Sequence, residues 1–269
     1  MVSLSFVQFK PIFGDVQGNL DQIKKVIPRA KHGIIVLPEL FNTGYTFTSK
    51  QEAAELAEEV PEGETCATLM GLSKKMDSTI VAGFAERFDS KIYNSAIVVS
   101  DGKLLGVYRK AHLFYKEKLW FTPGKTGFPV FDTKDGNVGV MICFDWIYPE
   151  AARVLALNGA DVIAHPSNLV LPGLAQRGMR IRSLENRVFT ITANRVGIEK
   201  RGEDRFRFTG RSQIVSPKMK VLATANATET TVKSVEVDLS QARNKNITKL
   251  NNLLEGRRVD LYASLMKQA

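Results

Sequence analysis

The stretch VGVMICFDWIYPEAARVLALNGADVIAHPSN, residues 138–168, decides the fold class. It contains an apolar strand over Val138–Ile142, a short turn, a helix over Pro149–Asn158 and a second strand over Asp161–Ala164. Glu150 suits the first turn of that helix, because the N–H groups there lack partners and the helix dipole favours a negative charge. A strand, a helix and a strand in this order predict an α/β or mixed α+β layered domain.

The same alternation continues along most of the chain. Several strands are so uniformly apolar that both of their faces must be covered. The other predicted strands are Leu4–Gln8, Gly33–Leu37, Thr79–Ala85, Ser95–Val99, Leu104–Tyr108, Val188–Thr192, Ser212–Val215, Val221–Ala225 and Val232–Val237. The other predicted helices, with apolar residues spaced near 3.6, are Asn19–Ile27, Glu52–Glu59, Glu64–Met76 and Gln176–Asn186.

The composition indicates one globular domain. The chain has 269 residues, of which 44% are hydrophobic and 24% are charged. Because this composition hardly changes along the chain, we expect a single domain over residues 1–269. From about Ser240 the strand pattern gives way to spaced leucines, which predicts a C-terminal tail from about residue 240. This tail either packs on the domain or crosses to a partner subunit.

Several classes of protein are disfavoured. No apolar run approaches the roughly 20 residues of a membrane-spanning helix. The start MVSLSFVQFK lacks the regions of a signal peptide, so we expect a cytoplasmic protein with no membrane contact. The net charge of +9 would suit a nucleic-acid partner, but the Lys and Arg residues are scattered among acidic ones, so we expect none. The only two cysteines, Cys66 and Cys143, exclude a disulfide framework and a zinc site built on paired cysteines.

Glu39 is the first candidate for chemistry. In GIIVLPELFNTGY, residues 33–45, the apolar run Ile34–Leu37 is followed by Pro38 and then by this carboxylate at the end of a core strand. A buried carboxylate must be paired, hydrogen-bonded or protonated, and desolvation raises its pKa toward the range of a general base. The alternative is that Glu39 caps the following loop.

Cys143 is the second candidate, because it lies where a strand turns into a helix. Such a turn presents a side chain in a cleft, as in a nucleophile elbow, and leaves the N–H of Phe144 free to point at a developing oxyanion. A thiolate is intrinsically nucleophilic and is favoured by a nearby cation. The alternative is a buried structural cysteine, which is what we expect of Cys66 on its helix.

Lys110 and Glu117 are the third and fourth candidates, in KLLGVYRKAHLFYKEKLWFTPG, residues 103–124. Most lysines are solvated, but the aromatic neighbours of Lys110 predict an ammonium held in a cleft, where it stabilises a thiolate and an oxyanion. Glu117 either orients a substrate or is a surface partner of Lys116 or Lys118.

A Cys143–His165 pair is the weaker interpretation of the nucleophile. Cysteine hydrolases often use histidine, and of the three histidines only His165 follows a strand at a suitable place. The papain-type signature is absent, however, and HPSN, residues 165–168, reads as a strand end and turn. His165 with Ser167 and Asn168 then lines a pocket.

Three motifs in order resemble the nitrilase superfamily, the thiol hydrolases of non-peptide carbon–nitrogen bonds. They are PELFNTGY around Glu39, YRKAHLF around Lys110 and GVMICFDWIYPE around Cys143. The similarity continues through HPSNLV and TANRVG to about Val237, and it is closest to archaeal-type small aliphatic nitrilases and amidases. The resemblance implies an αββα sandwich whose subunits pair through their helical faces into an αββααββα homodimer.

The resemblance also implies a role for each candidate. Glu39 would be the general base and Cys143 the nucleophile. Lys110 and the N–H of Phe144 would stabilise the oxyanion, and Glu117 would position the substrate. The implied chemistry passes through a thioester and requires no metal and no cofactor.

The residues after the nucleophile bear on the substrate. Many nitrile-cleaving members have Trp and Glu there, whereas this chain has Phe144 and Asp145, a pattern closer to the amidase and carbamoyl-amidase branches. We therefore expect a small aliphatic amide, with a nitrile or an N-carbamoyl amine as alternatives. The expected pocket residues, each with core packing as the alternative, are Tyr45, Tyr115, Phe144, Trp146, Ser167 and Asn168.

Two interpretations from other classes are open to test. A hydrolase similar to isochorismatase relatives would need a catalytic Asp at an early strand end, but neither Asp15 nor Asp21 closely follows an apolar run. A non-enzymatic basic binding module would depend on its charge and not on Cys143.

Overall fold

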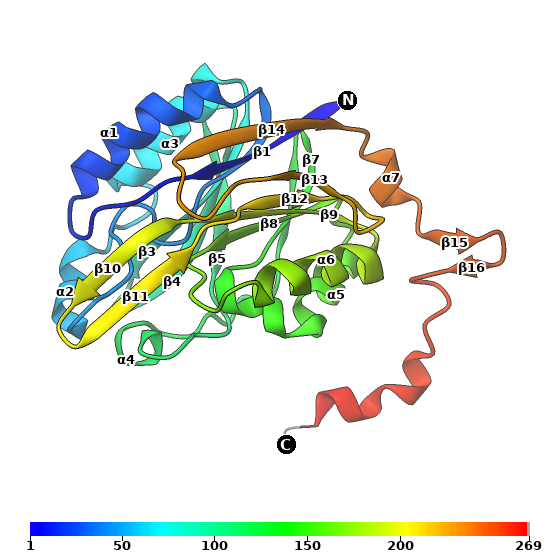
Figure 1. Ribbon diagram of the computed structural model, residues 1–269. Helices are drawn as coiled ribbons and strands as arrows, with labels where there is room; N and C mark the ends of the chain where they lie inside the picture. The colour runs from blue at the N-terminus through cyan, green and yellow to red at the C-terminus, as the bar shows by residue number, and fades with distance from the viewer. Residues whose placement is uncertain (268–269) are drawn as a thin grey trace.

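Two six-stranded sheets form the centre of the molecule, of which the computed structural model describes residues 1–267 (Figure 1). The first sheet has the order β14-β1-β2-β3-β4-β5 and the second the order β13-β12-β9-β8-β7-β6. The first comprises β1 (Val2–Gln8), β2 (Gly33–Val36), β3 (Thr79–Phe88), β4 (Lys91–Ser100), β5 (Lys103–Arg109) and β14 (Thr231–Val237). The second comprises β6 (Val130–Thr133), β7 (Gly136–Val140), β8 (Val162–Ser167), β9 (Phe189–Asn194), β12 (Gln213–Val215) and β13 (Val221–Thr224).

Each sheet has a parallel centre and antiparallel edges. In the first sheet β1, β2 and β3 run parallel, while β14, β4 and β5 pair antiparallel. In the second sheet β7, β8 and β9 run parallel, while β6, β12 and β13 pair antiparallel. Parallel strands need both faces covered, which explains the uniformly apolar runs of the sequence.

Helices cover the outer face of each sheet. The helices α1 (Val16–Val26) and α3 (Glu64–Lys75) share a buried apolar cluster with the first sheet. The helices α5 (Pro149–Leu157) and α6 (Leu174–Asn186) share another with the second sheet. A third cluster fills the space between the sheets with side chains such as Phe6, Val140 and Ile191. The predicted αββα sandwich is therefore confirmed.

Several element boundaries differ from the predictions for local reasons. The first helix begins at Val16 and not at Asn19, because the Asp15 side chain caps it by accepting from the Gly18 N–H at 3.0 Å. The helix predicted over Glu52–Glu59 is α2 (Lys50–Leu56), capped by Ser49. The strand β8 continues to Ser167 through Pro166, which is tolerated because β7 pairs with β8 only as far as Ala164.

Some elements were not predicted. The hairpin of β10 (Val196–Arg201) and β11 (Asp204–Thr209) extends from the sheets beside α2, and α4 (Glu117–Trp120) is a single turn (Figure 1). Within the described residues 1–267, four 3₁₀ turns cover Ile27–Arg29, Cys143–Ile147, Val259–Leu261 and Ala263–Met266.

The C-terminal tail extends away from the sandwich (Figure 1). It contains α7 (Ser240–Arg243) and a small hairpin of β15 (Asn246–Thr248) and β16 (Asn251–Asn252). Leu250 is 94% exposed and Leu265 is 61% exposed. Among residues 1–267 no helix combines the length and the apolar character that crossing a membrane requires.

Candidate active site

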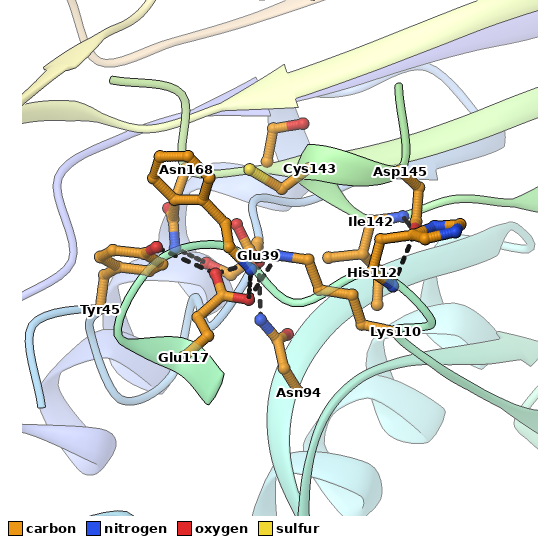
Figure 2. A network of polar contacts seen from close by, with 12 residues as sticks. Glu39, Tyr45, Asn94, Lys110, His112, Glu117, Ile142, Cys143, Asp145 and Asn168 are labelled. Carbon is orange, nitrogen blue, oxygen red and sulfur yellow. Dashed lines mark hydrogen bonds and ion pairs between the residues drawn. The ribbon is translucent and has the colours of Figure 1, made fainter. Parts of the chain in front are cut away.

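The candidate residues come together where strands of both sheets end (Figure 2). Glu39 lies three residues beyond β2 and Lys110 directly follows β5. Cys143 lies three residues beyond β7, and Asn168 directly follows β8. Because parallel strands end at the same edge of a sheet, residues far apart in sequence meet there.

Lys110 is the centre of a buried cluster of charges. Its Nζ lies 2.6 Å from Oε1 of Glu39, and 2.9 and 2.8 Å from Oε1 and Oε2 of Glu117. The side chains of Lys110 and Glu39 are fully buried, and that of Glu117 is 4% exposed. Glu117 is therefore not a surface partner of a neighbouring lysine, and two buried carboxylates contact Lys110.

Burial and charge act in opposite directions on this cluster. Burial by itself lowers the pKa of Lys110, but Glu117 and Glu39 raise it, so the net pKa lies above its usual range and the ammonium is kept. Burial raises the pKa of Glu117 to about 7, although Lys110 opposes the shift. The cluster therefore holds one permanent cation between two carboxyl groups.

Glu39 is held on one side and open on the other. Its Oε1 accepts from Lys110 and, at 2.7 Å, from Nδ2 of Asn94, while its backbone carbonyl accepts from Nδ2 of Asn168 at 2.9 Å. Its Oε2 is buried without a partner within residues 1–267. A Cβ on Gly83 would lie 2.4 Å from the Glu39 Cα, so glycine is required for this close approach. The free oxygen is available as a proton acceptor.

Cys143 has a strained backbone at the start of a 3₁₀ turn. Its φ is +41°, which is unusual for a residue with a side chain, and its side chain is 5% exposed. Figure 2 shows the sulfur beside Glu39 and Lys110. Burial and then Glu39 raise the pKa of the thiol well above its usual range, and Lys110 opposes them only in part. Burial and Glu39 therefore outweigh the effect of the Lys110 cation, which by itself favours the thiolate.

Asp145 links the cysteine turn to the lysine segment, a structural role that was not predicted from the sequence. Its Oδ2 accepts from the Tyr108 hydroxyl at 2.7 Å and from the Ile142 N–H at 2.9 Å. Its Oδ1 lies 2.7 Å from Nδ1 of His112. The acidic residue two positions after Cys143 was a visible signal, but its side-chain partners Tyr108 and His112 lie more than 30 residues away in sequence.

His165 supports the backbone of Cys143 and not its sulfur. Its Nε2 lies 2.8 Å from the Cys143 carbonyl oxygen and its Nδ1 3.2 Å from the Thr192 hydroxyl. Burial lowers the pKa of His165 to about 4, so the ring is neutral and Nε2–H donates to the carbonyl. The Cys143–His165 pair is therefore not the arrangement in this structure.

A narrow pocket of about 20 Å³ lies next to the thiol. Phe144, Trp146 and Asn168 line it together with Phe114 and apolar residues after β8. Tyr45 and Tyr115 instead line a second small pocket, of about 10 Å³, beside Glu117. Tyr115 is 56% exposed, whereas Tyr45 is buried.

Ser167 is buried and donates to the His165 carbonyl at 3.1 Å, so it does not line the pocket beside the thiol. The part of the chain that the structure describes contains no group of three or more His, Cys, Asp or Glu residues able to hold a metal ion.

Comparisons with known proteins show which family the chain belongs to. The family model for carbon-nitrogen hydrolases matches residues 3–246. A nitrilase of Pyrococcus abyssi is 50% identical over 265 residues, covering 97% of this chain and 99% of the relative. An N-carbamoylputrescine amidase of Solanum lycopersicum is 34% identical, covering 99% of this chain and 95% of the relative.

A solved carbon-nitrogen hydrolase of Helicobacter pylori superposes with a TM-score of 0.85 at 29% identity, covering 99% of both chains. Three findings support one conclusion: the match of the family model, the similar relatives and the shared fold. The chain belongs to the carbon-nitrogen hydrolase family of the nitrilase superfamily.

Proposed function

We propose that this carbon-nitrogen hydrolase converts a small aliphatic amide to a carboxylate and ammonia through a thioester on Cys143. The observation that carries the proposal is the buried Glu39–Lys110–Glu117 cluster beside a thiol on a strained turn. Such a costly arrangement of charges is typical of a catalytic site.

The first half of the reaction forms the thioester. The Cys143 sulfur attacks the amide carbon while Oε2 of Glu39, which is free in the structure, takes the thiol proton. The oxygen of the tetrahedral intermediate is stabilised by the Lys110 ammonium and the Phe144 N–H. The C–N bond then breaks, and Glu39 gives its proton to the leaving ammonia.

The second half of the reaction removes the acyl group. Glu39 takes a proton from water as the water attacks the thioester, and the same two groups stabilise the second tetrahedral intermediate. The C–S bond breaks, Glu39 returns its proton to the sulfur to restore the thiol, and the carboxylic acid loses its proton to solvent as the carboxylate leaves. Glu117 holds Lys110 in place through both halves.

The pocket favours a small substrate. A volume of about 20 Å³ holds little more than one water molecule, and its walls at Phe144 and Trp146 are apolar. An aliphatic nitrile is the second candidate, because the Pyrococcus abyssi relative is a nitrilase. An N-carbamoyl amine is supported by the Solanum lycopersicum relative.

The test is a panel of short aliphatic amides, the matching nitriles and N-carbamoyl amines, with ammonia release as the measurement. We expect the highest kcat/KM for the shortest amides of the panel, and no ammonia release by Cys143→Ala. Failure of every substrate would contradict the proposal, and a preference for nitriles would support the second candidate.

We further propose that the protein is a single-domain cytoplasmic homodimer that pairs through its helical faces. Large apolar side chains on α5 and α6 are exposed in the single chain: Val154, Leu157, Leu174, Ile181 and Leu184. The free and buried Cys66 and Cys143 suit a reducing compartment. Light scattering after gel filtration should give twice the chain mass for the wild type and a lower mass for Leu157→Glu.

A further inference from the structure

A buried ion pair that takes no part in the proposed reaction joins Arg195, the residue before β10, to Glu199 on β10. Arg195 Nη1 lies 3.0 Å from Oε2 of Glu199, and the two side chains are 1% and 7% exposed. Arg195 also donates from Nη2 to the Pro11 carbonyl at 3.1 Å. Desolvating two charges is costly, and well-packed apolar residues often stabilise a core as well. Such a pair calls for a reason other than stability.

The second oxygen of Glu199 holds the backbone of the loop that carries Tyr45. Its Oε1 accepts from the Tyr45 N–H at 3.1 Å, and from the Thr46 N–H and hydroxyl at 2.6 Å each. Gly44 permits this approach, because its φ is +83° and a Cβ there would lie 3.0 Å from Oε2 of Glu199. Glu199 therefore fixes where the Tyr45 backbone lies.

The Arg195 side chain supports the ring of the same tyrosine. Its guanidinium lies over the Phe208 ring at 4.0 Å, and the Phe208 ring meets the Tyr45 ring edge-on at 5.8 Å. Tyr45 is thus held at its backbone by Glu199 and at its ring by a residue that Arg195 covers. Its hydroxyl donates to Oε1 of Glu117 at 2.9 Å, which is the carboxylate bound to Lys110.

We infer that Arg195 and Glu199 are positioning residues for the active site, which hold Tyr45 so that its hydroxyl keeps Glu117 against Lys110. The inference rests on the proposed function, since it assigns a purpose to the placement of Lys110. The path from the ion pair to the reacting atoms runs through the Tyr45 hydroxyl.

A double-mutant cycle tests this path. Glu199→Gln keeps the shape of the side chain but removes the charge that binds Arg195, so kcat should fall by about 10- to 100-fold, with KM changed far less. In a Tyr45→Phe background the same substitution should lower kcat by no more than about twofold, because the hydroxyl that it positions is already absent. If the two substitutions lower kcat by independent factors, so that the double variant shows their product, the inference is overturned.

A matched control is a second ion pair of this hairpin. Arg201 lies 2.7 Å from Glu52 and donates to the Thr46 carbonyl at 3.1 Å, but both side chains are partly exposed, and within residues 1–267 neither forms a hydrogen bond with Tyr45. Glu52→Gln should leave kcat within about twofold of the wild type. An equal loss in Glu52→Gln and Glu199→Gln would show that the hairpin merely needs its ion pairs, which would also overturn the inference.

Two further measurements keep the test decisive. If Glu199→Gln does not fold by circular dichroism, Phe208→Leu replaces it, since that change removes the ring support and leaves the ion pair intact. If the wild type releases no ammonia from any substrate, the proposed function fails by itself. In that case the same double-mutant cycle is measured by the rate at which iodoacetamide alkylates Cys143, because this rate depends on the charged neighbours of the sulfur. If the two substitutions change the alkylation rate by independent factors that multiply, the inference is overturned.

Discussion

The two sheets share one pairing pattern but hold different parts of the candidate site. From β14 to β5 and from β6 to β13, the neighbours are paired antiparallel, parallel, parallel, antiparallel and antiparallel. In the first sheet Leu-Pro-Glu follows β2 and ends at Glu39, and in the second Met-Ile-Cys follows β7 and ends at Cys143. Both turns contain a residue with positive φ, Leu40 at +46° and Cys143 at +41°. The same strand-end geometry thus presents a carboxylate in one sheet and a thiol in the other.

The difference between the sheets is one of charge. Beside the first sheet, Lys110 is paired with Glu39 and with Glu117 on α4, and all three groups are buried. The second sheet holds a buried thiol whose pKa is raised and a buried imidazole whose pKa is lowered. Removing Lys110 leaves two buried carboxyl groups without their cation, whereas removing the thiol breaks none of these ion pairs. Activity and stability should therefore separate between the two sheets.

The largest effect is expected at the nucleophile. Cys143→Ala should reduce ammonia release by more than about 10⁴-fold, because no covalent intermediate can form. The free energy of unfolding should change by no more than about 1 kcal/mol, since a small neutral group is lost. Steady-state kinetics and urea unfolding measure the two quantities. Residual turnover near that of the wild type would contradict the proposed role of Cys143.

Glu39→Gln, in the buried charge cluster, should have the next largest effect on activity. We expect kcat to fall by about 10²- to 10⁴-fold with little change in KM, because the side chain keeps its shape but no longer accepts the thiol proton. Initial rates over a range of substrate concentrations separate kcat from KM. A rise in KM alone would make Glu39 a pocket residue and not the base.

Lys110→Met should affect stability as well as activity. Two buried carboxyl groups lose their cation, which is expected to cost about 3–5 kcal/mol of unfolding free energy. The matched control Lys118→Met, at an exposed position on α4, should change the free energy of unfolding by less than about 0.5 kcal/mol. Adding Glu117→Gln to Lys110→Met should restore part of the loss, and no recovery would argue against a charge effect.

The smallest effect concerns pH and the second sheet. The pKa of His165 is about 4 in the folded chain and 6.5 in the reference state, so the unfolded chain binds more protons between these values. Its contribution to stability is present above pH 6.5 and is lost as the pH falls toward 4, by about 3 kcal/mol in total. The raised pKa of Glu117 acts in the opposite direction, because its contribution is lost as the pH rises from 4.5 to about 7.

Because His165 and Glu117 change the stability with pH in opposite directions, the useful quantity is the difference in unfolding free energy between a His165 variant and the wild type. Unfolding by urea at several pH values should show that the deficit of His165→Asn relative to the wild type shrinks as the pH falls from 6.5 to 4. A deficit that does not vary with pH would mean that His165 is not kept neutral by burial.

Much of the fold could be predicted because its signals are local. Apolar runs mark the central strands, and spaced apolar residues mark the four helices that cover them. The hairpin of β10 and β11 was missed because its strands are half exposed and rich in charge, as in Glu199 and Arg201. Tyr115 was expected beside the thiol because it is close to Lys110 in sequence, but it lies in the second pocket and is largely exposed.

The sequence alone determined the layered fold and the candidates for the reactive groups, because strand ends and residue types are read from neighbours along the chain. Only the tertiary structure decided how those groups are held. Asn94 on Glu39, Asp145 on Tyr108, and Glu199 on the Tyr45 loop are contacts between segments that are far apart in sequence. Such contacts have no periodicity, since they depend on which strand ends the two packed sheets bring to the same place.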